Sequence, residues 1–186
     1  MITTRTKTGI TAVSAIAAFL VTTGIIAAQV AQDRYQLKAL NGISFSEIKG
    51  YEGWKVVAPS YRTDKNEIRV ILGNDTLLNA YRQGVPESGK PFPDGSILVK
   101  IAYSEKKSPE FPAAIEPDAL QRVELMIKDA KRFKSTNGWG YARFVYDAKA
   151  KTFATYGKDD AFDQECNGCH LIVKGRDYVF TKYPER

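Results

Sequence analysis

The chain has 186 residues, of which 44% are hydrophobic and 26% are charged, with a formal net charge of +6. This composition excludes bulk disorder, a collagen-like repeat and a multi-pass membrane protein, and the length is that of one domain. The basic excess is small and spread along the chain, which argues against nucleic acid as a partner.

The first 31 residues have the pattern of a targeting segment. Arg5 and Lys7 precede a run from residue 8 to residue 32 that carries no charge. A positive start followed by an apolar stretch is typical of a secretory signal peptide. As a helix, the run would be roughly 37 Å long, enough to cross a bilayer core of about 30 Å. We therefore expect residues 1–31 to be a signal peptide or an N-terminal signal-anchor, and residues 32–186 to form an exported, periplasmic domain.

The first half of the body alternates short helix-like and strand-like segments. A short helix is expected near Phe45, followed by a strand over 54–61 that Pro59 interrupts. Residues 67–72 alternate as a strand does. Asn74 precedes a short amphipathic segment as a helix N-cap would, and that helix should end near Gly84. The turn over 91–95 leads into a strand over 96–103.

The second half predicts further strands and a C-terminal segment with both cysteines. A loop is expected over 105–118. Within 119–135, alternation at Val123, Leu125 and Ile127 favours a strand, whereas the residues after them favour a helical turn. Strands over 140–146 and 151–156 should pair across a turn at 147–148. Strands close in sequence with a few short helices predict an α+β fold built mainly on an antiparallel sheet.

The only two cysteines and the only histidine form one C-x-x-C-H motif: Cys166, Cys169 and His170. This spacing suits two thioether bonds to a haem, with the adjacent histidine turned to the iron. A thioredoxin-like dithiol shares the spacing, but it usually follows a strand early in the chain. A structural zinc site needs four ligands, and the chain has three cysteines and histidines in total. The motif therefore predicts one covalent haem c with His170 as its metal ligand.

The second axial ligand of the iron has few candidates. A second histidine is lacking, and no methionine follows His170. Met126 lies in an alternating apolar stretch, where a packing role is expected. The sequence therefore favours an open distal position, which is suited to small-molecule chemistry or gas binding.

Three longer stretches give the chain a family resemblance. They are GKPFPDGSILVKI (89–101), NGWGYARFVYD (137–147), and ECNGCH with the following LIVKGRDYVFTKY (165–183). Together they resemble the cytochrome P-460 family, which includes the cytochromes c′-beta, from about Trp54 to Tyr183. The resemblance implies a mostly antiparallel β-fold that forms homodimers.

The resemblance also assigns roles to three residues beside the haem motif. Lys100 matches the lysine that P-460 enzymes join covalently to the haem macrocycle, and burial there would lower its pKa. Arg69 matches a position near the distal haem face, where its guanidinium would bond a ligand or a propionate. Phe92 matches a position that caps the distal iron in c′-beta members. From the residues alone, Lys100 and Arg69 could equally be exposed strand residues, and Phe92 could equally be a core residue.

The resemblance implies oxidation of hydroxylamine, with electrons passed to a soluble carrier. Such a reaction needs a proton acceptor; Asp159, Asp160 and Asp163 precede the haem motif, where acidic residues also favour a helix N-terminus. One alternative is a c′-beta-like protein that binds nitric oxide or carbon monoxide without turnover. Another is an electron carrier with Met126 or a lysine as the sixth iron ligand.

Overall fold

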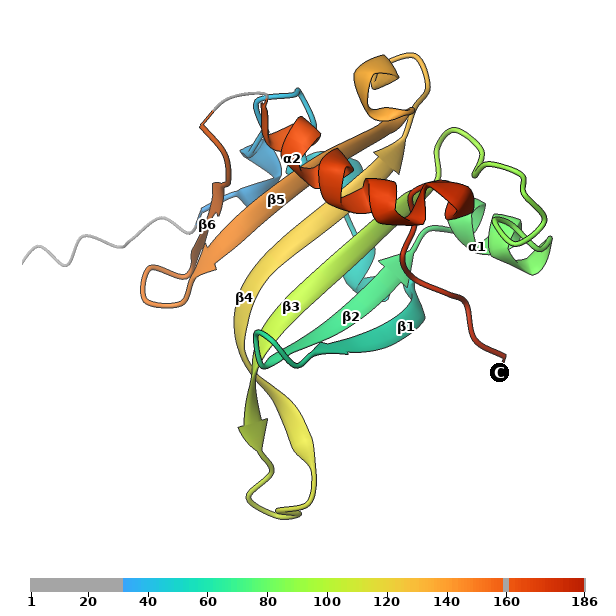
Figure 1. Ribbon diagram of the computed structural model, residues 1–186. Helices are drawn as coiled ribbons and strands as arrows, with labels where there is room; N and C mark the ends of the chain where they lie inside the picture. The colour runs from blue at the N-terminus through green and yellow to red at the C-terminus, as the bar shows by residue number, and fades with distance from the viewer. Residues whose placement is uncertain (1–31, 159–160, 186) are drawn as a thin grey trace, which may run out of the picture. The chain divides into compact units, whose positions relative to one another are not determined.

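The computed structural model describes residues 32–158 and 161–185. The predicted signal peptide or anchor therefore lies outside the described residues. One antiparallel sheet, in the order β1-β2-β3-β4-β5-β6, forms the centre of the fold (Figure 1). Its strands are β1 (Lys55–Arg62), β2 (Glu67–Gly73), β3 (Ile97–Lys107), β4 (Ile115–Lys128), β5 (Trp139–Asp147) and β6 (Thr152–Thr155). The α+β prediction is confirmed.

The helices of the described chain are short. Two are α-helices, α1 (Asp75–Arg82) and α2 (Ala161–His170), and the others are the 3₁₀ turns η1 (Arg34–Gln36), η2 (Phe45–Ile48), η3 (Tyr51–Gly53), η4 (Lys134–Thr136) and η5 (Leu171–Arg176). The Asn74 side chain caps α1 by accepting a hydrogen bond from the Leu77 amide, as the sequence predicts. None of the helices in the described residues is long and apolar enough to span a membrane.

Two expectations about the strands are corrected. The loop expected over 105–118 is shorter, because β3 continues to Lys107 and β4 begins at Ile115, so a long hairpin projects from the sheet (Figure 1). Pro59 does not interrupt β1; the irregularity is a register shift between Val56 and Ala58. The ambiguous stretch 119–135 is strand to Lys128, followed by a turn and η4.

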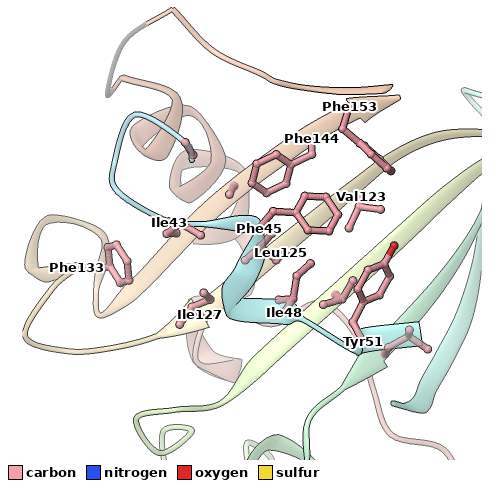
Figure 2. Packing of buried hydrophobic residues seen from close by; sticks show 14 residues of the cluster. Ile43, Phe45, Ile48, Tyr51, Val123, Leu125, Ile127, Phe133, Phe144 and Phe153 are labelled. Carbon is pink, nitrogen blue, oxygen red and sulfur yellow. The ribbon is translucent and has the colours of Figure 1, made fainter. Parts of the chain in front are cut away.

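One face of the sheet packs on the N-terminal segment of the domain. Phe45 and Ile48 of η2 are fully buried against inward side chains of β4 and β5. The ring centroids of Phe45 and Phe144 lie 4.7 Å apart, and Figure 2 shows the two rings as neighbours. Strand alternation puts every second residue on this face. The other face is covered by α1, α2 and the C-terminal tail, and it carries the site.

Candidate functional site

A row of charged side chains crosses four strands on the face below α2. In the strand register, Lys100 of β3 pairs with Glu124 of β4, and Glu124 pairs with Arg143 of β5. Glu124 stands between Val123 and Leu125, which point to the opposite core. Neighbours in register interact directly across a sheet, so residues far apart in sequence form one charged cluster.

Glu124 is the centre of this cluster. Its Oε2 lies 2.7 Å from Lys100 Nζ and 3.1 Å from Arg122 Nε, and its Oε1 lies 2.6 Å from Arg143 Nε. Burial would raise the pKa of Glu124, but Lys100 and Arg143 outweigh it and lower that pKa to about 2. The carboxylate therefore stays ionised at neutral pH.

Lys100 is subject to two opposed effects. Burial lowers the pKa of its ammonium group, and the Glu124 carboxylate opposes that shift. The net direction is down, as the resemblance implies for this position. Lys100 thus faces the site in the described structure, but with a carboxylate partner that the sequence analysis did not anticipate.

A second carboxylate extends the charged cluster toward the edge of the sheet. Glu67 is buried, and its two oxygens contact Arg69 Nε at 2.7 Å and an Arg122 terminal nitrogen at 2.5 Å. Arg69 also has a terminal nitrogen, Nη2, that is buried without a hydrogen-bond partner among the described residues. Arg69 therefore has a donor available to a ligand.

The helix α2 carries the C-x-x-C-H motif over this face. Asp163 anchors the helix, because its carboxylate accepts hydrogen bonds from the Asn41 side chain at 2.8 Å and the Tyr141 amide at 3.2 Å. Cys166 is half-buried and Cys169 is exposed. Burial raises the pKa of Cys166 to about 12, so its thiol is neutral. Asp163 is thus structural here, and Asp159 and Asp160 lie outside the described residues.

His170 has the arrangement of a metal ligand. Its Nδ1 lies 2.6 Å from the Tyr178 carbonyl oxygen, and because a carbonyl only accepts, the nitrogen donates. Burial lowers the pKa of the imidazole, so the neutral ring leaves Nε2 with a free electron pair. The rings of Tyr141 and Phe180 both pack against the imidazole, at centroid distances of 5.1 and 5.0 Å.

These elements line an open cavity of about 960 Å³, at the upper end of the volumes of ordinary ligand pockets (~300–1,000 Å³). It brings together five of the six residues that the sequence analysis singled out: Arg69, Lys100, Cys166, Cys169 and His170. The cavity lining also includes Met126, for which a packing role was expected. Three further lining residues were not predicted as site residues: Glu124, Arg143 and Tyr141. For Glu124 and Arg143, the signal in the sequence was a charged residue within an otherwise largely apolar predicted strand.

Phe92 lies elsewhere. Within the described chain, the cavity lining does not include it. Its ring is 2% exposed and packs edge-on against Tyr81 and Trp139, at centroid distances of 5.0 and 6.0 Å. The structure thus places Phe92, on the loop before β3, in the core between α1 and β5.

The residues present fit a haem. The cavity has two cysteines and a histidine with a free Nε2 on one wall. On the facing sheet, the buried Arg69 Nη2 and Tyr141 hydroxyl have no hydrogen-bond partner in the described residues. The charged cluster on this sheet has four cationic side chains and two carboxylates, namely Arg69, Lys100, Arg122 and Arg143 with Glu67 and Glu124. This positive excess complements the two propionates of a haem. The fold and site therefore define a haem-binding β-sheet protein.

Comparison with known proteins agrees with this class. The family model for cytochrome P460 matches residues 48–181, so the chain belongs to the cytochrome P460 family, and a haem cofactor follows from membership. No curated protein matches the sequence significantly.

Proposed function

We propose that this chain is an exported c-type haem protein that oxidises hydroxylamine at an open iron site and passes the electrons to a soluble carrier. The observation that carries the proposal is the single cavity shared by the C-x-x-C-H motif, Lys100 and Arg69. Membership of the cytochrome P460 family supports it. The apolar leader supports export to the periplasm, and the family resemblance supports a homodimer.

The proposal gives each wall of the cavity a task. Cys166 and Cys169 hold one haem through thioethers, and His170 binds its iron through Nε2. When bound, the haem supplies an iron that coordinates the substrate and accepts its electrons. The unpartnered Nη2 of Arg69 donates a hydrogen bond that orients a nitrogen-oxide ligand.

Lys100 distinguishes the enzyme from its closest alternative. The family resemblance implies for the oxidase a Lys100 side chain joined to the macrocycle, and its amine would have to be neutral to react. Burial favours the neutral amine, whereas Glu124 at 2.7 Å favours the ammonium. That ion pair supports a second candidate, a c′-beta-like binder of nitric oxide or carbon monoxide without turnover. Met126 in the cavity lining is the observation for the third, an electron carrier with a sixth protein ligand.

One optical experiment tests these candidates. The oxidised and reduced spectra of the haem-loaded protein are compared with those of Lys100→Met and of Lys106→Met. The control also removes a β3 lysine paired with a β4 glutamate, but it lies outside the cavity. A red-shifted ferrous Soret band that Lys100→Met alone abolishes, together with hydroxylamine turnover, is expected. An ordinary high-spin spectrum, unchanged in Lys100→Met, refutes the oxidase and favours gas binding. A low-spin spectrum that Met126→Ala abolishes identifies the electron carrier.

A further inference from the structure

The turn behind the C-x-x-C-H motif has an unfavourable backbone. Asp177 and Tyr178 are consecutive non-glycine residues in the left-handed region, with φ of 46° and 66°. Such angles are uncommon for residues with a side chain, and a bulky residue such as tyrosine is a genuine outlier there. This turn directs the Tyr178 carbonyl to His170 Nδ1, 2.6 Å away. Unfavourable conformations persist only where surrounding contacts hold them.

A buried ion pair holds this turn. Lys128 Nζ of β4 lies 2.9 and 3.0 Å from the two carboxylate oxygens of Asp177, and the two side chains are 8% and 11% exposed. The same carboxylate accepts a hydrogen bond from the Phe92 amide at 2.8 Å. Lys128 also lies over the Trp139 ring, 5.0 Å from its centroid. The contacts therefore tie the tail to β4, to β5 and to the loop before β3.

The Lys128–Asp177 ion pair matters for the geometry of the turn more than for the free energy of unfolding. Buried ion pairs contribute little more to stability than a well-packed apolar pair does, but they select one arrangement of the groups they join. Here the arrangement is continued by two backbone hydrogen bonds of the turn, from the Asp177 amide to the Lys174 carbonyl at 3.1 Å and from the Tyr178 amide to the Val173 carbonyl at 3.2 Å. A continuous chain of contacts therefore leads from Lys128 on the sheet, through Asp177 and the turn, to the His170 imidazole.

We propose that Lys128 and Asp177 are positioning residues for His170, the histidine that binds the haem iron. They fix the turn that presents the Tyr178 carbonyl to His170, and so they set how strongly the imidazole donates electrons to the iron. A strong Nδ1 hydrogen bond raises the basicity of a ligating histidine, and greater donation stabilises the oxidised metal. The inference rests on the proposed function, which makes His170 the iron ligand.

The test uses the haem-loaded protein and two readouts other than activity. These are the midpoint potential and the iron–histidine stretching band of the ferrous protein in resonance Raman spectra. Asp177→Asn and Lys128→Met should each raise the potential, by the order of a tenfold change in the reduction equilibrium (about 59 mV for one electron), and lower the stretching frequency. Lys128→Arg keeps the charge and should restore values near those of the wild type. The variants act on opposite partners, so one suffices if the other fails to fold.

A matched control removes an ion pair from the adjacent residue. Glu87→Gln deletes the 2.9 Å contact with Arg176, which belongs to the same tail. Unchanged potential and stretching frequency in Asp177→Asn and Lys128→Met overturn the inference, as does an equal shift in Glu87→Gln. An iron–histidine band that persists in His170→Ala overturns the proposed role of His170 instead, so the two failures are distinguishable.

Discussion

Replacement of Glu124 by glutamine should lower the free energy of unfolding at neutral pH. Its pKa falls from 4.5 to about 2 in the folded protein, where Lys100 and Arg143 outweigh the burial penalty. One pKa unit corresponds to about 1.36 kcal/mol. Ionised Glu124 therefore contributes about 3 kcal/mol to the free energy of unfolding at neutral pH, and Glu124→Gln should lose about that amount.

The contribution of Glu124 should depend on pH in a defined window. Because the folded pKa is depressed, the stabilisation is complete above the unfolded value of 4.5 and is lost as pH falls toward about 2. At pH 3, about 1 kcal/mol should remain. Urea unfolding of wild type and Glu124→Gln at pH 7 and pH 3 measures this change, and the gap between the two proteins should narrow by about 2 kcal/mol.

The chain has a matched control for this measurement. Glu116 faces Lys106 across the same two strands, 3.4 Å away, but both side chains are more than a third exposed. Glu116→Gln should therefore change the unfolding free energy by under about 1 kcal/mol. A loss in Glu124→Gln no larger than in Glu116→Gln, or a gap that stays constant with pH, would refute the reasoning.

Three further predictions concern attachment and packing. Phe92→Ala should cost about 3–5 kcal/mol of unfolding free energy and leave carbon monoxide association unchanged, because the ring packs in the core; faster association would show that it caps the ligand site. Cys169→Ser should retain haem through Cys166 alone, seen as a red-shifted pyridine haemochrome band; an unshifted band would contradict the two-thioether assignment. Gly140→Ala should lower the melting temperature and cost about 1–3 kcal/mol of unfolding free energy, because a Cβ at this position would lie 2.3 Å from the Phe133 ring. Gly53 has open space around it, so Gly53→Ala is the control that should leave the melting temperature unchanged.

Local chemistry made part of this protein predictable from sequence. The C-x-x-C-H motif can be interpreted from local sequence alone, because this spacing puts the two thiols and the imidazole on about one helical turn in any fold. Alternation likewise predicted most strands, and it put Lys100 on the opposite side from Val99. The extent of the β3–β4 hairpin escaped prediction, because the strand residues of its outer part are exposed or half-buried and show no apolar alternation.

The sequence by itself therefore determined the C-x-x-C-H motif, the class of fold and the alternation that separates Lys100 from Val99. Only the tertiary structure decided that Glu124 partners Lys100, that Phe92 is a core residue, and that Asp177 meets Lys128 beneath the turn at His170. These relations join residues that are tens of positions apart, or on strands whose register is set by the packing of the whole sheet. No local pattern encodes such contacts, because each depends on which side chains the assembled sheet and tail bring to the same place.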